Sequence, residues 1–190
     1  MKGDRSLALL FLFVIFFLAD CHLNYREAML SKELSENIPN VVLVRFRHTV
    51  VKNNSIVAIV EAERGEEYLK KGEIKLEKVR YTEFDEEGKI VDEGSADSAI
   101  YNTKTKDAEI VGNIKIRSEI EKGEIDASRL HWSNDKRLLV GDPNEKVVLK
   151  RDDGSFVTGR GFSSDLRLKE IKFSGEVLGR YIGKEKNEKE

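Results

Sequence analysis

Apolar and polar residues alternate along most of the chain after residue 40, and this period of two restricts the fold more than any other feature. Val42, Val44 and Phe46 alternate with arginines at positions 45 and 47. A later run has the same spacing: Ile110, Gly112, Ile114 and Ile116. Such a period is typical of a strand with one buried face. We therefore expect these four residues to face inward, and the interleaved Lys115 and Arg117 to face solvent.

Residue pairs that favour tight turns interrupt the alternation roughly every ten residues, the cadence of short antiparallel strands. These pairs are Asn53-Asn54, Lys71-Gly72, Glu87-Gly88, Lys122-Gly123, Asn134-Asp135, Asp153-Gly154 and Ser174-Gly175. The chain has only two prolines and no long amphipathic helix. The sequence therefore predicts an all-β fold of antiparallel strands, as a sandwich or jelly roll.

A faint internal repeat runs through the predicted strands. Ala96-Asp97 followed by Tyr101 resembles Ala127-Ser128 followed by Trp132, with an offset of 31 residues. The similarity continues where Ile110-x-Gly112-Asn113 resembles Leu139-x-Gly141-Asp142, and a weaker copy runs from Ala62 to Tyr68. Self-similarity at this period indicates stacked β units that bury one face against their neighbours.

The amino terminus resembles an export signal. Lys2 and Arg5 precede an apolar run of thirteen residues, from Leu7 to Ala19. As a helix this run rises about 20 Å, less than the ~30 Å of a hydrocarbon core, which favours a secretory signal over a spanning helix. Leu18-Ala19-Asp20-Cys21 is similar to a bacterial lipobox, although Asp20 is not the small residue usual at that position. Residues 1–21 are thus either a signal peptide that ends at a lipidated Cys21 or an uncleaved membrane anchor.

Both interpretations of the amino terminus tether the rest of the chain to a membrane outside the cytoplasm. We expect residues 22–37 to be a linker or a short helix, because a few apolar residues stand there among charges. Residues 38–180 form the predicted β domain. Residues 181–190 are rich in charge, which predicts a disordered tail.

Composition argues against several functions. Lys+Arg (33) and Asp+Glu (35) nearly cancel, to a net charge of −2, so nucleic-acid binding is disfavoured. A single cysteine excludes an intrachain disulfide, and three scattered histidines lack the spacing of metal ligands. The chain has no nucleophile signature and no glycine-rich phosphate loop before a helix. We expect a protein that is not an enzyme and that needs no cofactor or metal.

Three runs of residues, in this order, resemble the LptC family and the related OstA/LptA β-jelly-roll domains. The first is Gly94-Ser95-Ala96-Asp97 with Tyr101-Asn102 and Val111-Gly112-Asn113-Ile114, the second is Leu130-His131-Trp132 with Val140-Gly141-Asp142-Pro143, and the third is Gly159-Arg160-Gly161-Phe162 with Asp165-Leu166-Arg167-Leu168. The resemblance covers about residues 38–180 and follows a membrane-targeting segment. Family members often have a spanning helix, so the possible lipobox departs from the family pattern.

The resemblance implies a slotted antiparallel β jelly roll whose interior holds lipid A acyl chains. It also implies a position on the periplasmic side of the inner membrane. There the family accepts lipopolysaccharide from the ATP-driven LptB/F/G transporter and passes it to an LptA-type periplasmic bridge. Under this reading the first strand, about residues 41–51, faces the transporter.

On this reading, two sets of residues become candidates for function. Residues that could line a lipid slot are Ile114, Ile116, Trp132 and Phe162; Trp132 could equally be core filler. Residues on a strand that could pair with the bridge are Leu166, Leu168, Ile171 and Phe173, because edge strands add to partner sheets through their backbones. Cys21 is the candidate lipid anchor. A structural or adhesive surface lipoprotein with a filled β sandwich is the alternative function.

Overall fold

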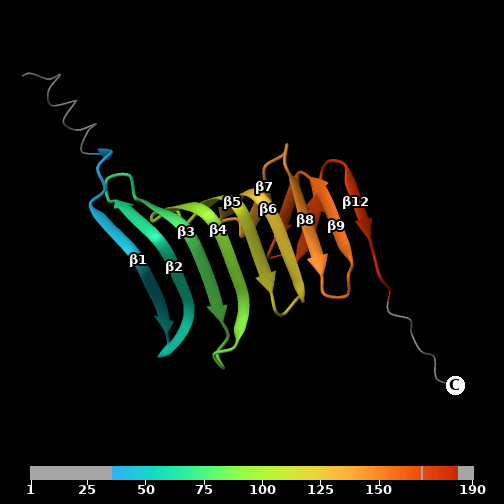
Figure 1. The fold of residues 1–190 in the computed structure, drawn as a ribbon, viewed down its shortest axis with the longest axis horizontal. Coiled ribbons are helices and arrows are strands. Elements are labelled where there is room, and N and C mark those ends of the chain that lie inside the picture. Colours follow the sequence, from blue (N-terminus) through green and yellow to red (C-terminus); the bar gives the residue numbers. More distant parts are fainter. Residues whose placement is uncertain (1–35, 168, 184–190) are drawn as a thin grey trace, which may run out of the picture. The chain divides into compact units, whose positions relative to one another are not determined.

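The computed structural model describes residues 36–167 and 169–183, which form twelve antiparallel strands (Figure 1). The strands are β1 Val41–Lys52, β2 Ser55–Tyr68, β3 Glu73–Phe84, β4 Ile90–Asn102, β5 Ala108–Ser118, β6 Gly123–Ser133, β7 Leu138–Gly141, β8 Lys146–Arg151, β9 Phe156–Arg160, β10 Phe162–Asp165, β11 Glu170–Phe173 and β12 Val177–Arg180. All of them lie in one compact unit that begins at Pro39. The predicted all-β, antiparallel class is confirmed.

The first six strands form a meander in which each strand pairs with the one before it. At β6 the sheet divides. The half of β6 that ends at Ser133 pairs with β7, while the half that begins at Gly123 pairs with β8. From there β7, β10 and β11 continue one branch, and β8, β9 and β12 continue the other. Figure 1 shows the second branch in front of the first at the carboxy-terminal end of the sheet.

The two branches pack face to face through apolar side chains. The rings of Phe162 on β10 and Phe173 on β11 lie 5.7 Å apart between centroids. A β-carbon added to Gly159 of β9 would lie 2.8 Å from Phe173, and one added to Gly141 of β7 would lie 3.0 Å from Val147 of β8. The branches therefore approach so closely that a side chain at Gly159 would displace the ring of Phe173, and one at Gly141 would need Val147 to give way by a few tenths of an ångström.

The buried core lies beside this junction. Its buried members are Ala96, Ile114, Leu130, Val147 and Phe162. As predicted, Ile114 is inside the core, Ile110 and Ile116 pack against it, and Lys115 is exposed. The prediction for Gly112 is wrong. Its φ is +81°, and an added β-carbon would lie 2.5 Å from the carboxylate of Asp97, so Gly112 belongs to a bulge rather than to the inner face.

That bulge is part of a line of irregularity that crosses the first six strands at one level. We call it the bulge row: Arg45, Glu63, Lys78, Asp97, Asn113 and Ser128, which stand opposite one another from β1 to β6. Arg45, Lys78 and Asn113 have φ values of 48°, 51° and 44°. Left-handed backbone within a strand increases its local twist and bend, and the ribbons of the long strands bend along their length (Figure 1).

The predicted turns and repeat both have structural counterparts. All seven predicted turn pairs fall at or between strand ends. Asn53 and Asn54 have φ values of 49° and 64°, as a two-residue hairpin turn requires. The repeat corresponds to every second strand: Ala62, Ala96 and Ala127 each precede the bulge-row residue of β2, β4 and β6. The similarity thus marks where alternate strands cross the bulge row.

Several sequence predictions lie outside the described residues. These are the signal peptide or anchor, Cys21, most of the 22–37 linker and the tail after residue 183. Within the described part of the chain, no helix is long and apolar enough to span a bilayer.

Candidate functional site

An apolar row lies directly beside the bulge row and extends beyond the packed core. Its members are Phe46, Ala62, Val79, Ala96, Ile114 and Ala127, one from each of β1 to β6, and each is adjacent in sequence to a bulge-row residue. Three register pairs align it across the sheet: Phe46 with Ala62, Val79 with Ala96, and Ile114 with Ala127. Every member is buried or half-buried, whereas five of the six bulge-row residues are exposed. Strand alternation thus gives this sheet an apolar inner face and a polar outer face.

The apolar row is covered at one end only. At β4 to β6 the row is packed in one buried cluster with Leu130 of β6, Val147 of β8 and Phe162 of β10. Toward the amino terminus, β1 and β2 make extensive contacts only with their neighbours in the sheet. Large apolar side chains of the inner face stay exposed there, including Leu43, opposite the buried Gly65, at 47% and Val50, opposite Ala58, at 39%. The inner face therefore changes from a filled core at β6 to open apolar surface at β1.

Small residues keep the open part of the row shallow. Ala62 and Ala96 are both buried, and Gly65 is buried next to them on β2. The ring of Phe46 lies on Gly65, where an added β-carbon would be 2.6 Å from its Cε1 atom. Methyl groups and a glycine leave room above the sheet that larger side chains would occupy.

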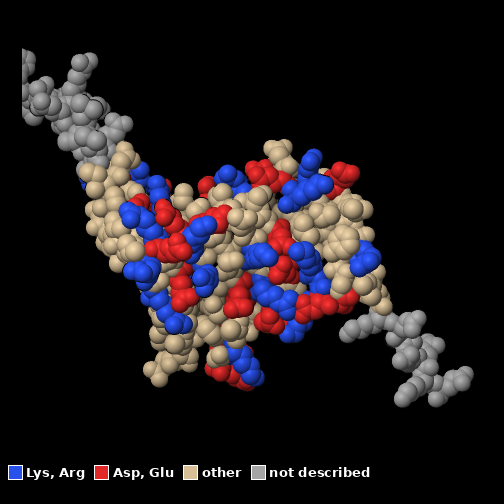
Figure 2. Space-filling view, viewed as in Figure 1, with Lys and Arg blue, Asp and Glu red and all other residues tan. Residues whose placement is uncertain are grey.

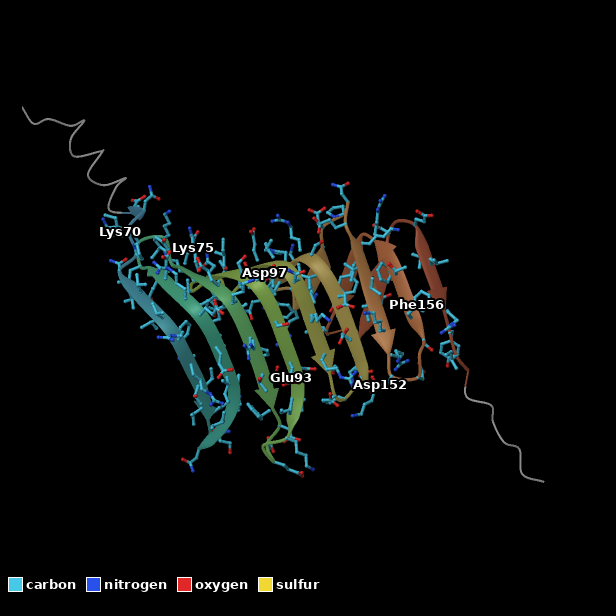
Figure 3. The ribbon with its side chains drawn as sticks, in the orientation of Figure 1. Lys70, Lys75, Glu93, Asp97, Asp152 and Phe156 are labelled. Atoms are coloured by element: carbon cyan, nitrogen blue, oxygen red, sulfur yellow. The ribbon has the colours of Figure 1, made fainter. Side chains whose placement is uncertain are left out.

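The bulge row is held together by polar contacts on the outer face. Lys78 donates a hydrogen bond of 2.8 Å to Asp97, and the Asn113 amide donates one of 2.7 Å to the other carboxylate oxygen. Figure 3 shows Asp97 on β4, and the face seen in Figure 2 carries charges of both signs. The hydrogen bond from Lys78, followed by that from Asn113, lowers the pKa of Asp97, and the same contact raises the pKa of Lys78. These contacts join β3, β4 and β5 at the level where the strands bend.

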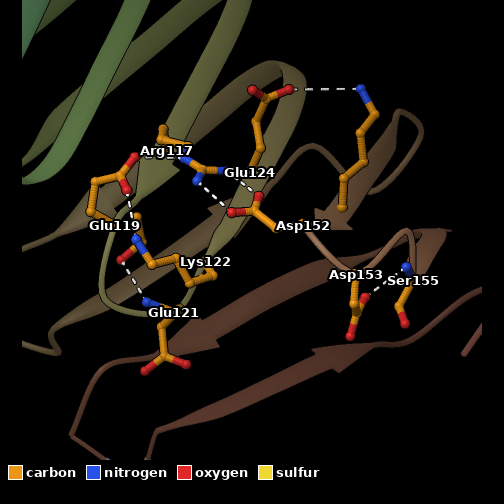
Figure 4. A network of polar contacts seen from close by, with 10 residues as sticks. Arg117, Glu119, Glu121, Lys122, Glu124, Asp152, Asp153 and Ser155 are labelled. Carbon is orange, nitrogen blue, oxygen red and sulfur yellow. Dashed lines mark hydrogen bonds and ion pairs between the residues drawn. The ribbon is translucent and has the colours of Figure 1, made fainter. Parts of the chain in front are cut away.

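A second polar network holds the closed end (Figure 4). The Arg117 guanidinium donates to both oxygens of Asp152, at 2.6 and 2.8 Å, and to Glu119 at 2.9 Å. Lys122 also donates to Glu119. These hydrogen bonds lower the pKa of Asp152 and of Glu119 and raise that of Arg117. The bidentate pair joins β5 to the turn between β8 and β9. Arg117, predicted to point outward, is half-buried in this network.

Among the strands that the structure describes, three have one unpaired edge. β1 pairs only with β2 along its twelve residues, and eleven of these are exposed. β11 pairs only with β10, and β12 pairs only with β9; each has four residues. Such edges present N–H and C=O groups to which another sheet can add a strand.

Some of the predicted slot residues lie in the buried core, and others lie at its margin. Ile114 and Phe162 are at most 2% exposed, within the core. Ile116 packs against that core. Trp132 is half-buried near the end of β6, with the Arg137 guanidinium 5.9 Å from its ring centre.

The predicted edge residues do not all fall on one strand. Ile171 and Phe173 are on β11, which is an edge strand. Leu166 is in the exposed turn after β10. Leu168 lies outside the described residues.

Sequence reasoning missed the bulge row and the open end of the apolar row. The internal repeat contained a signal for the bulge row. In Ala62-Glu63, Ala96-Asp97 and Ala127-Ser128, a small apolar residue is followed directly by a polar one. Among the residues that the structure describes, no cluster of His, Cys, Asp or Glu could hold a metal ion.

Comparisons with known proteins agree on the family and the fold. A family model described as "Lipopolysaccharide-assembly, LptC-related" matches residues 7–182. Among solved structures, the fold is similar to LptH of Pseudomonas aeruginosa, the LptA homologous periplasmic component of that organism's lipopolysaccharide transport device. The TM-score is 0.54 over 66% of this chain and 95% of that one, at 9% identity, so this likeness concerns the fold alone. Comparison with curated protein sequences gives no match.

Proposed function

The chain belongs to the LptC family of lipopolysaccharide-assembly proteins, which are not enzymes, and we propose that it carries lipopolysaccharide across its apolar row. In this proposal the acyl chains enter over β1 and β2, where the row is open, toward Val79 of β3, and lie against the small residues of the row. The core residues Ile114, Ile116 and Phe162 form the closed end of the slot, and Trp132 lies at its margin. The sugars remain outside.

The observation that carries the proposal is the one-sided cover of the apolar row. Each CH₂ group of an acyl chain transferred from water to an apolar surface gains roughly 0.8 kcal/mol, so an open apolar strip is a suitable acceptor. A filled β sandwich, as in a structural or adhesive lipoprotein, has no need of exposed apolar residues such as Leu43 and Val50 on the inner face of β1. This argues for a carrier over the structural alternative.

We further propose that the free edges connect the carrier to its partners by strand addition. β1, nearest the amino terminus, would receive the inner-membrane LptB/F/G-type transporter, and the edge that contains Ile171 and Phe173 would receive an LptA-type bridge. The energy for transport would come from the transporter's ATPase. The carrier then needs only binding and release.

The amino-terminal tether is part of the same proposal. We propose that residues 1–20 are removed and that Cys21 is acylated, which would keep the domain at the periplasmic side of the inner membrane. Intact-mass measurement of membrane-extracted protein should give acyl additions and a start at Cys21. A mass that begins at Met1 would favour the uncleaved anchor instead.

Site-specific photocrosslinking tests the lipid path. A photoreactive residue at Phe46 or Val79, on the apolar row, should crosslink to lipopolysaccharide in cells. The matched controls are Arg45 and Lys78, adjacent residues of the outer face. Equal crosslinking from both rows, or from neither, would contradict the carrier function.

A further inference from the structure

The loops at one end of the strands form a continuous rim with an excess of positive charge. We call it the basic rim: residues 69–72, 103–107, 134–137 and 166, 167 and 169, which follow β2, β4, β6 and β10. It carries eight Lys or Arg and two Asp, a net charge of +6. Its basic residues are Lys70, Lys71, Lys104, Lys106, Lys136, Arg137, Arg167 and Lys169.

Hydrogen bonds join each of these loops to the next. Thr103 donates its backbone N–H to Gly72 at 2.8 Å, Asn134 donates to the Asp107 carboxylate at 2.8 Å, and Leu166 donates to Arg137 at 3.0 Å. The hydrogen bond from Asn134 lowers the pKa of Asp107, so one of the two acids in the rim serves to connect two loops. The charges thus lie along one connected surface.

The turns at the opposite end carry the opposite charge. Residues 85–89, 119–122 and 152–154 contain seven Asp or Glu and two Lys, a net charge of −5. The whole chain has a net charge of only −2. Positive and negative charge are therefore separated along the strand direction. This separation orients the domain in an electric field, while the small net charge produces little overall attraction.

The chain enters the sheet at the basic rim. Asn40, just before β1, donates its backbone N–H to Glu67 at 2.7 Å, and its side chain accepts a hydrogen bond of 2.9 Å from Leu69 of the first rim loop. Any tether formed by residues 1–38 therefore leads into the domain from this end.

We propose that the basic rim contacts the anionic phospholipid headgroups of the membrane to which the chain is tethered, and so sets the orientation of the sheet. Point charges spread over four loops match a surface of many headgroups better than one small ligand, which needs converging donors. Carboxylates begin again in the strands beside the loops, at Glu73 of β3 and at Asp165 of β10, which pairs with Arg167 at 3.3 Å, so the excess of positive charge is carried by the loop layer. Since the Debye length is about 8 Å at physiological salt, that layer dominates at a membrane surface. The inference rests on the membrane tether proposed above.

The only tryptophan provides a native probe, because Trp132 lies two residues before the third rim loop. Full-length protein is reconstituted into vesicles of phosphatidylcholine, with or without phosphatidylglycerol, that contain a headgroup spin label. Trp132 fluorescence should be quenched several-fold more in the anionic vesicles. Raising NaCl from 0.1 to 1 M, which shortens the Debye length to about 3 Å, should remove that difference.

Charge reversal on the rim should have the same effect as salt. Lys104→Glu with Lys106→Glu lowers the net charge of the rim from +6 to +2, and the anionic-vesicle quenching should fall toward the neutral level. The control is Lys52→Glu with Lys146→Glu, which makes the same change of charge at exposed sites outside the rim.

Two contrary outcomes are distinguishable. Protein that fails to float with vesicles of either composition would refute the tether, and with it the proposed function's membrane location. Protein that floats but shows equal Trp132 quenching in neutral and anionic vesicles would overturn the basic-rim inference alone. The salt measurement needs no variant, so a misfolded rim variant cannot decide the result.

Discussion

Adjacent residues with opposite chemistry determine the two faces of this sheet. Ala96 is buried while Asp97 accepts hydrogen bonds on the outer face, and Ile114 is buried while Asn113 and Lys115 are exposed. In each strand a one-residue change of register would exchange these faces, which makes the register strongly specified. The bulge row adds a second constraint, because Gly112 has no space for a β-carbon beside Asp97.

Ile114→Asp should destabilise the fold strongly. Ile114 is 2% exposed among apolar neighbours, so a carboxylate there loses hydration without a partner. We expect a loss of about 3 kcal/mol or more, which corresponds to a fall in Tm of roughly 6–12 °C for a domain of this size. Lys115→Asp, at the exposed neighbour, is the control and should melt near the wild type. A wild-type melting curve for Ile114→Asp would mean that the face is misassigned.

Asp97 should make stability depend on pH in the acid range. Its pKa is lower in the fold than in the unfolded chain, so its contribution is present above the unfolded value of about 3.9. That contribution is lost as pH falls through the lowered folded pKa. Asp97→Asn should therefore be less stable than wild type near pH 7, and thermal melts should converge as the pH drops below 4. Asp135→Asn, in an exposed turn, is the comparison; a gap for Asp97→Asn that widens in acid would contradict the assignment.

At the scale of elements, the sequence predicts strands better than their branching. Alternation and turn pairs are local signals, so the hairpins of β1 to β6 follow from them. The division of β6 between β7 and β8 depends on contacts between distant residues, such as Gly141 with Phe162, which no local pattern contains. Similarly, the charge separation between the two ends appears only when alternate turns are assigned to the same end.

Proline substitutions can test β11 as a partner edge. Successive N–H groups of an edge strand point alternately toward its neighbour and toward the open side. Of Ile171→Pro and Lys172→Pro, one should lower Tm by breaking a bond to β10. The other should keep its Tm and lose binding to an LptA-type partner in pull-down. If both variants fold normally and still bind, β11 is not the edge that the partner uses.

At the scale of the whole molecule, half of the candidate site was predictable. Ile114 and Ile116 were placed inward from their spacing, and they lie at the closed end of the apolar row. The open end was not predictable, because the same alternation describes a strand that is covered and a strand that is not. Exposure of Leu43 and Val50 on the inner face depends on which distant strands stop short of β1, and only the three-dimensional arrangement reveals it.

Bound lipopolysaccharide should protect one side of the sheet. A ligand that binds only the folded state, at a concentration of 100 times its Kd, adds about 2.7 kcal/mol of stability. Backbone amide exchange should slow most in the strands that the ligand covers. Hydrogen–deuterium exchange should slow in β1 to β3 on addition of lipopolysaccharide and change little in β8 and β9. Uniform protection, or protection confined to β8 and β9, would place the ligand elsewhere.

The meander of β1 to β6 also affects how the chain reaches its native state. Each of these strands pairs with the strand just before it, so hairpins can form in sequence, and such local pairing costs less closure entropy than the pairing of distant strands. The closed end cannot form in this way, because β6 acquires its partners β7 and β8 only after residues up to Arg151 are available. During that interval β1 is already an exposed edge. Its Arg45, Arg47 and Lys52, with no acidic residue in the strand, repel a second copy of the same edge and oppose aggregation before assembly.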